Sequence, residues 1–260
     1  MSAVALHHEP AGPEEGPPLL LGASLGATLE MWDPQVPALA AHRRVIPFDH
    51  RGHGASPVVP GPYSIADLGA DVLALLDRLA IERASYCGLS LGGMVGMWLA
   101  AHAPERIERL VLICTAAQAP VPSLYGERAA LVREAGTVDA IADAVVARWF
   151  TPAFAAEHRD VVAHHRAMIA ATPAEGYAGG CEVIVALDLR AALPSIRART
   201  LVIAGAEDPA LPPACGQAIA DAVPGARFRV LDSASHLASV EQAAAVTELI
   251  ADHLDHREEP

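Results

Sequence analysis

The sequence predicts an α/β fold, with a mostly parallel sheet, helices on both faces of the sheet and an inserted helical cap. Short apolar runs alternate with amphipathic segments up to residue 114, a pattern typical of parallel strands covered by helices. Between residues 120 and 187 the pattern is helical, and strands return near residue 200. We therefore expect a core domain of residues 1–119 and 188–260 and a helical cap of residues 120–187.

In the first half of the chain, the clearest helix runs over residues 64–80, where apolar residues recur at helical spacing. Ser64 is expected to cap this helix, because its hydroxyl can accept a hydrogen bond from an unpaired backbone N–H. Another helix should follow Ser90 and end at Pro104, since proline cannot continue a helix. The other elements expected here are a short helix over 34–42 and strands over 19–22, 45–49, 84–87 and 109–114.

In the second half, the helical pattern of the cap is strongest over residues 127–135, 138–150 and 155–171. Apolar runs over residues 200–204 and 226–231 predict two further strands. The chain is expected to close with a helix over 237–253 and to fray over 255–260.

Composition limits the classes of partner and compartment. The chain has 260 residues and a net charge of −13, which disfavours nucleic acid and anionic membranes because both attract basic surfaces. No apolar run is long enough to span a membrane, and the N-terminus lacks the basic start and apolar stretch of a signal peptide. We expect a cytoplasmic protein that acts on a small molecule. The sequence does not indicate an oligomeric state.

Every basic residue is an arginine, and this excludes mechanisms that need a lysine, such as a Schiff base or a phosphate-loop lysine. The four cysteines lie far apart, which argues against a zinc site and a disulfide framework. No histidine spacing supports a metal, so His50, His53, His164 and His165 are interpreted as structural or solvated. We therefore expect neither a metal nor a cofactor.

The candidate nucleophile is Ser90, which lies in a Gly-x-Ser-x-Gly turn after a short apolar run and before a helical segment. This spacing predicts a sharp strand-to-helix turn in which the serine has a strained backbone, and glycine at positions 88 and 92 allows strand and helix to approach. The N–H of Leu91 would lie in the first helical turn, where unpaired donors favour a negatively charged oxygen. Leu91 is therefore a candidate oxyanion donor.

A serine hydroxyl needs a base within hydrogen-bond reach and an acid that orients the base. Asp208 and His236 each follow an expected strand, where side chains of a parallel sheet meet at its carboxyl edge. Glu207 is the competing acid, but Asp208 fits the spacing better. The order Ser90, Asp208, His236 is that of the α/β-hydrolases, and we interpret the three residues as a catalytic triad.

The second oxyanion donor should come from the loop after the first strand. Leu25 is the candidate, because its neighbours Ser24 and Gly26 are small and allow the backbone to approach a ligand.

Together these motifs resemble the α/β-hydrolases along nearly the whole chain, including the string Asp-His-Arg-Gly-His-Gly-Ala-Ser at 49–56. More narrowly, the chain resembles the 3-oxoadipate enol-lactonases. That resemblance rests on residues 24–26 with 31–35, on 87–96, on Arg-Trp-Phe-Thr-Pro at 148–152 and on Gly-Ala-Glu-Asp-Pro at 205–209. The chain departs from the family after His236, where Ser239 and Ala243 replace an asparagine and a proline that are frequent in the family. In some relatives a decarboxylase is fused to this domain, and we expect that activity to be absent here.

The resemblance implies that the protein opens the lactone ring of 3-oxoadipate enol-lactone through an acyl-enzyme, in the β-ketoadipate pathway of aromatic catabolism. We expect Arg148 to bind the substrate carboxylate, since a guanidinium pairs with it in bidentate fashion, and Trp149 to line the same pocket. An esterase, a C–C bond hydrolase or a perhydrolase would share the triad and remains an alternative. A non-catalytic ligand receptor of this fold is a further alternative.

Overall fold

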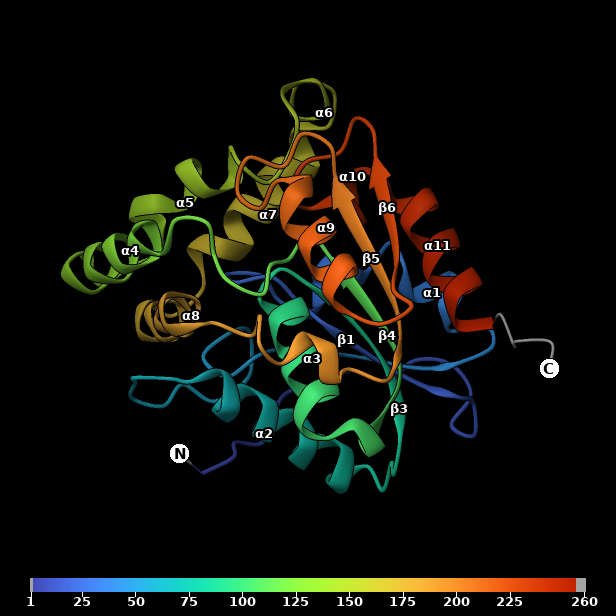
Figure 1. Cartoon of the computed structure of the whole chain (residues 1–260). Coiled ribbons are helices and arrows are strands. Elements are labelled where there is room, and N and C mark those ends of the chain that lie inside the picture. The colour runs from blue at the N-terminus through green and yellow to red at the C-terminus, as the bar shows by residue number, and fades with distance from the viewer. Residues whose placement is uncertain (1, 256–260) are drawn as a thin grey trace.

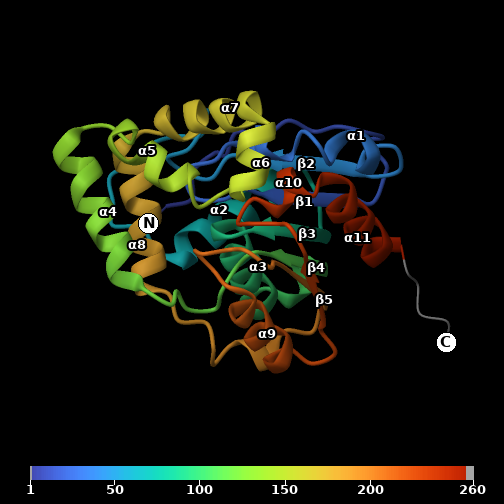
Figure 2. The ribbon, with the colours of Figure 1, turned by 90° about the horizontal axis from the view of Figure 1, so that it is seen from above.

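The structure is a computed structural model that describes residues 2–255. Within this range one sheet has six strands in the order β2-β1-β3-β4-β5-β6, and every neighbouring pair is parallel (Figures 1 and 2). The predicted α/β fold and parallel sheet are confirmed. The strands are β1 (Pro18–Gly22), β2 (Arg44–Phe48), β3 (Ala84–Leu89), β4 (Ile107–Ile113), β5 (Arg199–Gly205) and β6 (Arg227–Leu231).

Helices cover both faces of the sheet, as Figure 2 shows from above. One face carries α2 (Ile65–Arg78), α3 (Leu91–His102) and α9 (Pro213–Ala222), and the other carries α1 (Val36–Leu39) and α11 (Ala243–Asp255). Because helices pack on both faces, β3 between them is buried along its whole length. Short 3-10 helices lie at Leu29–Trp32, Pro104–Arg106 and Leu193–Ser195.

The start of α2 is set by a capping box. The Ser64 hydroxyl accepts a hydrogen bond from the Asp67 N–H at 3.2 Å, and the Asp67 carboxylate accepts one from the Ser64 N–H at 2.9 Å. Both contacts satisfy N–H groups that a helix start leaves unpaired. The predicted cap at Ser64 is confirmed.

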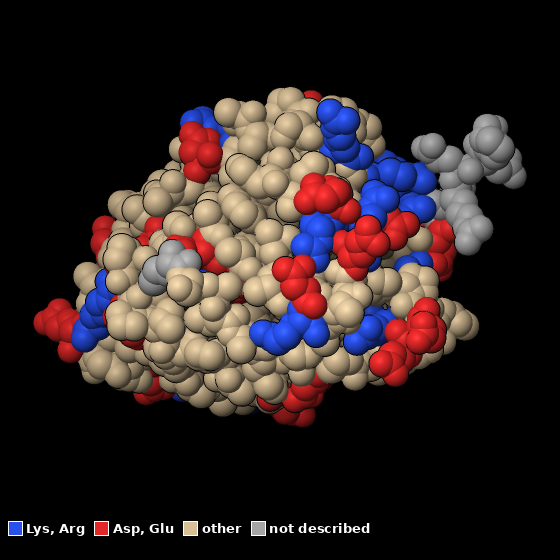
Figure 3. Space-filling model, turned by 90° about the horizontal axis from the view of Figure 1, so that it is seen from below, with Lys and Arg blue, Asp and Glu red and all other residues tan. Residues whose placement is uncertain are grey.

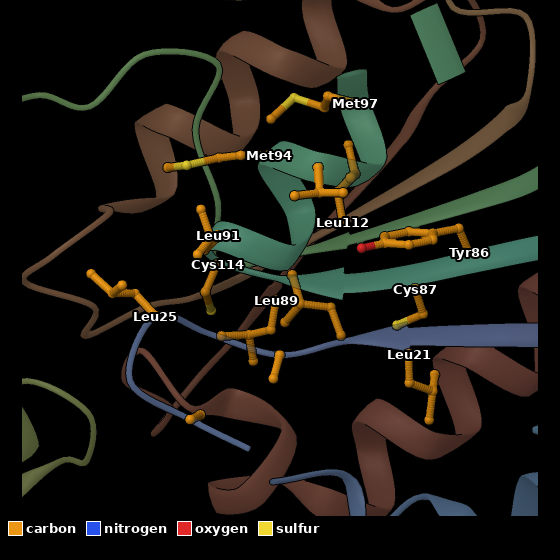
Figure 4. Packing of buried hydrophobic residues seen from close by; sticks show 14 of the residues in the cluster. Leu21, Leu25, Tyr86, Cys87, Leu89, Leu91, Met94, Met97, Leu112 and Cys114 are labelled. Carbon is orange, nitrogen blue, oxygen red and sulfur yellow. The ribbon is translucent and has the colours of Figure 1, made fainter. Parts of the chain in front are cut away.

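Part of the core lies between the central strands and α3. Figure 4 shows Tyr86 of β3 beneath α3, with Met97 and Leu112 nearby. The Tyr86 hydroxyl donates a hydrogen bond to the Gly92 carbonyl at 3.0 Å, so this large buried ring also ties the strand to the first turn of the helix. The start of α3 is therefore fixed relative to β3.

Between β4 and β5, a stretch that the structure describes in full, lie five α-helices that we call the inserted helices. They lie at the end of the sheet toward which the strands point (Figure 1). They are α4 (Pro122–Ala135), α5 (Asp139–Val146), α6 (Pro152–Glu157), α7 (Arg159–Ala170) and α8 (Ala174–Ala186).

The inserted helices differ in detail from the predicted ones. The helix expected over 138–150 ends at Val146, and the one expected over 155–171 is interrupted at His158, whose φ of −119° and ψ of 52° are not helical. The sequence pattern did not predict α8, because three glycines lower its helix propensity. Two of them, Gly176 and Gly179, lie where a Cβ would collide with Gly52 and Tyr63, so close packing explains these glycines.

The last part of the chain also differs from the prediction. α9 was not predicted. The closing helix expected over 237–253 is split into α10 (Ala238–Glu241) and α11 by Gln242, whose φ of −118° and ψ of 49° break the helical path. α11 continues to Asp255, and the rest of the tail expected to fray lies outside the described residues.

None of the described helices is both long and apolar enough to cross a membrane. On the face shown in Figure 3, acidic and basic side chains lie among one another rather than in separate fields. This face therefore presents no extended positive surface among the residues that the structure describes.

Candidate active site

Ser90 lies at the junction of β3 and α3 with a φ of 56° and a ψ of −114°. This is a sparsely populated conformation for a residue with a side chain. A Cβ on Gly88 would lie 2.3 Å from the backbone of Gly92, and a Cβ on Gly92 would lie 2.2 Å from the Gly22 carbonyl oxygen. The predicted strained turn and the need for glycine on both sides of Ser90 are therefore confirmed.

Asp208 follows β5 and His236 follows β6, and the two side chains meet. His236 Nδ1 lies 2.8 Å from Asp208 Oδ2, and both residues are buried. The other carboxylate oxygen of Asp208 accepts hydrogen bonds from the backbone N–H groups of Ala210 and Leu211 at 2.8 and 3.0 Å. Glu207, the competing acid, is exposed. The structure thus pairs the imidazole with Asp208.

Ser90 and His236 line the same cavity, together with Ser24 and Leu25 from the loop after β1. Within residues 2–255 no hydrogen bond joins Ser90 to His236, and in unliganded enzymes such contacts are often long and shorten when substrate binds. The cavity has a free volume of about 20 Å³, the room that a single water molecule needs.

The two amide groups proposed as oxyanion donors, those of Leu25 and Leu91, have no hydrogen-bond acceptor within the described chain. Leu25 follows β1 and Leu91 is the first residue of α3, and Figure 4 shows both at the same end of the sheet. Unpaired donors at a helix start and in a neighbouring loop are suited to stabilise a negatively charged oxygen.

Two buried histidines hold the loop that contains Leu25. His50 Nε2 donates to the Ala23 carbonyl at 3.1 Å, while His53 Nε2 accepts a hydrogen bond from the Gly26 N–H at 2.9 Å. His53 Nδ1 faces the Arg51 carbonyl at 3.1 Å; a carbonyl only accepts, so this nitrogen carries the proton. Burial lowers the pKa of His50 to about 3 and also lowers the pKa of His53. Both rings are therefore neutral and structural, and the sequence did not indicate that they fix this loop.

Arg148 and Trp149 lie in the turn after α5 and line the cavity. Arg148 Nη2 donates to the Pro209 carbonyl at 2.8 Å, beside Asp208. The Trp149 carbonyl accepts a hydrogen bond from the Leu237 N–H at 2.9 Å, beside His236. The turn therefore contacts the loops of both the acid and the base.

Glu241 links the same loops and was missed by sequence reasoning. One of its carboxylate oxygens accepts a hydrogen bond from the Ser235 N–H at 2.7 Å, and the other accepts one from the Thr151 N–H at 2.9 Å and one from the Thr151 hydroxyl. The available signal was its place in the string His-Leu-Ala-Ser-Val-Glu-Gln at 236–242, close to the candidate base. Glu241 thus joins the residue before His236 to the start of α6.

Three further cavity residues were also missed: Tyr125 and Arg128 of α4 and Tyr177 of α8. No motif surrounds them, and only the packing of the inserted helices brings them near Ser90. Their pattern in the sequence is that of ordinary helix residues.

The described residues contain no cluster of His, Cys, Asp and Glu able to hold a metal ion. Cys87, Cys114 and Cys181 are buried and Cys215 is half-buried, and all four are free thiols. Burial raises the pKa of each thiol, so the cysteines are protonated at neutral pH.

Known proteins of similar sequence and structure share the fold described above. The sequence profile of the family described as "alpha/beta hydrolase fold" matches residues 17–243. The chain is 42% identical to 3-oxoadipate enol-lactonase 2 of Acinetobacter baylyi over 93% of this chain and 90% of that protein. The crystal structure of the enol-lactonase from Burkholderia xenovorans LB400 has a TM-score of 0.94 and 44% identity, covering 96% of each chain. A hydrolase from Pseudomonas aeruginosa PA01 has a TM-score of 0.93 and 46% identity, covering 96% of this chain and 94% of that chain.

Proposed function

The chain belongs to the alpha/beta hydrolase fold family, and within it we propose an enzyme that hydrolyses 3-oxoadipate enol-lactone to 3-oxoadipate. It is a hydrolase that acts on ester or lactone bonds, as its enol-lactonase relatives do. The observation that carries the proposal is the cavity shared by Ser90 and His236, in which the imidazole is held by Asp208. The choice of this lactone as the substrate rests on the similarity to the 3-oxoadipate enol-lactonases of Acinetobacter baylyi.

In the proposed reaction, His236 Nε2 takes the Ser90 proton while Ser90 Oγ forms a bond to the lactone carbonyl carbon. The negative charge that develops on the carbonyl oxygen is stabilised by the N–H groups of Leu25 and Leu91. The ring C–O bond then breaks, and the enol oxygen leaves with the proton from His236. It remains attached to the acyl-enzyme and converts to the ketone.

In the second half of the reaction, His236 takes a proton from a water molecule that attacks the acyl carbon. Ser90 leaves with the proton, and 3-oxoadipate is released. Asp208 remains ionised, holds the Nδ1–H tautomer of His236 and stabilises the imidazolium that forms in each half.

The inserted helices are proposed to act as a cap of residues 120–187 over the core domain of residues 1–119 and 188–260. Arg148 and Trp149 are proposed to contact the substrate, because both line the cavity. Arg148 retains N–H groups beyond the one that it donates to Pro209, and these are available to a substrate carboxylate.

The decisive experiment follows the ultraviolet absorbance of the lactone with purified wild-type protein and with Ser90→Ala. We expect turnover by the wild type. In the variant kcat should fall on the order of a million-fold, as it does when the nucleophilic serine of subtilisin is removed. A serine-directed phosphonate should label the wild type and not the variant. Turnover of p-nitrophenyl esters without turnover of the lactone would identify a different esterase, and lactone binding with neither turnover nor labelling would identify a receptor.

A further inference from the structure

The cavity beside Ser90 contains two guanidinium groups, those of Arg128 and Arg148, in a chain whose net charge is −13. Two other arginines of the inserted helices pair with acids: Arg133 contacts Glu175 and Glu182, and Arg166 contacts two aspartates of α5. Arg128 pairs with no carboxylate within residues 2–255. An uncompensated cation in the cavity of an acidic protein indicates a site for an anion.

The side chain of Arg128 is already oriented by its neighbour. Its guanidinium carbon lies 5.6 Å from the centre of the Tyr125 ring, a cation–π contact that holds the charge at the cavity wall. This contact leaves the guanidinium N–H groups available to a ligand, because an aromatic face satisfies the charge only weakly.

Tyr177 of α8 provides a second observation. The residue is fully buried and lines the same cavity, yet its hydroxyl has no hydrogen-bond partner in the described chain. Burial raises the pKa of this phenol, so its O–H is a donor, while Arg128, which lies close to the phenol oxygen, acts on the pKa in the opposite direction. A buried hydroxyl without a partner is costly, and a ligand oxygen would satisfy it.

The helices that carry these two side chains are fastened together. Arg133 of α4 donates to Glu175 at 2.9 Å and to Glu182 at 2.5 Å, and both acids belong to α8. These contacts lie outside the cavity and hold α4 against α8. The relative positions of Arg128 and Tyr177 are therefore set by the fold rather than by the ligand.

We propose that Arg128 and Tyr177 form a carboxylate-binding subsite that makes the enzyme selective for lactones and esters carrying a free carboxylate. This inference rests on the proposed function, since it places the subsite beside Ser90. A carboxylate accepts the guanidinium N–H groups and the phenol O–H at the same time. Arg148 differs from Arg128, because it already donates to Pro209 and so also supports the loop of Asp208.

The test compares two substrates of similar size, mono-p-nitrophenyl glutarate, which carries a carboxylate, and p-nitrophenyl valerate, which does not. Arg128→Gln should lower kcat/KM for the glutarate about 10- to 100-fold, the range for a lost hydrogen bond to a charged group. The valerate should change by less than about twofold. Arg128→Lys should restore part of the glutarate activity, since it keeps the charge without the fork of donors.

Tyr177→Phe separates a ligand-binding role from a structural one. It should lower kcat/KM for the glutarate by about fivefold, and it should leave the melting temperature unchanged or raise it, because the hydroxyl has no partner in the free enzyme. Arg229→Gln is the matched control for charge: Arg229 is exposed on β6, and its loss should affect neither substrate.

Equal losses for both substrates in Arg128→Gln, or no loss for either, would overturn the subsite. The proposed function is judged separately by Ser90→Ala with the valerate. If that variant kept wild-type activity, the proposed function would fail. If it were inactive while Arg128→Gln left the preference for the glutarate unchanged, only the subsite would be wrong.

Discussion

His236 donates its Nδ1–H to Asp208 Oδ2 over 2.8 Å, and Asp208 accepts two backbone N–H groups through its other oxygen. The backbone N–H groups thus fix one oxygen of the carboxylate, and the other oxygen fixes the imidazole. Because Nδ1 carries the proton, Nε2 is the nitrogen left to act as a base. The orientation of the base therefore depends on one carboxylate oxygen.

Asp208→Asn should lower kcat about 10³- to 10⁴-fold, because an amide nitrogen facing Nδ1 favours the wrong tautomer of His236. The measurement is steady-state kinetics with p-nitrophenyl valerate. Glu207→Gln is the control, since Glu207 is adjacent and exposed, and it should leave kcat unchanged. A larger loss in Glu207→Gln than in Asp208→Asn would show that Glu207, and not Asp208, is the acid of the triad.

His53→Leu should lower kcat with little change in KM, because it removes the acceptor for the Gly26 N–H and frees the loop that contains Leu25. We expect a loss of about tenfold, less than the hundredfold or more that follows deletion of an oxyanion donor itself. His53→Gln, which keeps an acceptor, should recover part of the rate. His102→Leu, at an exposed position at the end of α3, is the control. A rise in KM at constant kcat would instead indicate a binding role for His53.

Local chemistry explains why much of the fold and part of the site could be predicted. The strands are short apolar runs, and Ser64 and the glycines around Ser90 act through their immediate neighbours. Asp208 and His236 were placed near each other because the ends of parallel strands share one edge of the sheet. Each of these predictions needed only a local pattern or the topology.

The rest depends on contacts between distant segments. Arg128 and Tyr177 are 49 positions apart and meet only because α4 packs against α8. Glu241 bridges Thr151 and Ser235, and no spacing in the sequence indicates that contact. The glycines of α8 kept the sequence pattern from predicting this helix, whereas in the structure they allow it to pack closely. Helix propensity and motif spacing do not contain this information.

Glu241→Gln should lower kcat about tenfold and also lower the melting temperature, because the amide can no longer accept from Ser235 on one side and from Thr151 on the other. Kinetics with p-nitrophenyl valerate and thermal unfolding measure the two effects. Glu248→Gln, exposed on α11, is the matched control and should change neither. A loss of stability with unchanged kcat would show that Glu241 does not position His236.

Stability should fall as the pH is lowered below the ordinary histidine pKa. The pKa of His50 is 6.5 in its ordinary state and about 3 when buried in the fold. Below pH 6.5 the unfolded chain therefore binds a proton that the folded chain does not, and His50 alone should cost about 2 kcal/mol between about pH 7.5 and pH 5. Urea unfolding at both pH values measures the difference. His50→Gln keeps an N–H donor and does not titrate. In this variant the difference in unfolding free energy between the two pH values should therefore be smaller by about 2 kcal/mol. An unchanged pH dependence in this variant would contradict a buried neutral His50.

Ser90 should be replaceable by glycine at a lower cost in stability than by alanine. The φ of 56° and ψ of −114° strain any residue with a Cβ, at a cost of about 1–3 kcal/mol, and glycine removes the strain. The unfolded chain has more backbone entropy with glycine than with alanine, which lowers the stability of the glycine variant by roughly 0.5–1 kcal/mol and offsets part of the relief of strain. Both variants should be inactive, with Ser90→Gly more stable than Ser90→Ala by about 1 kcal/mol in urea unfolding.

The same pair of substitutions at Ser123 provides the opposite expectation. Ser123 is exposed within α4, where the backbone is helical, so glycine should be less stable than alanine by about 1 kcal/mol. Burial of the alanine methyl at Ser90 would favour alanine, so a preference for glycine at Ser90 and for alanine at Ser123 would indicate backbone strain at Ser90. If alanine were the more stable replacement at both positions, strain in the turn at Ser90 would be contradicted.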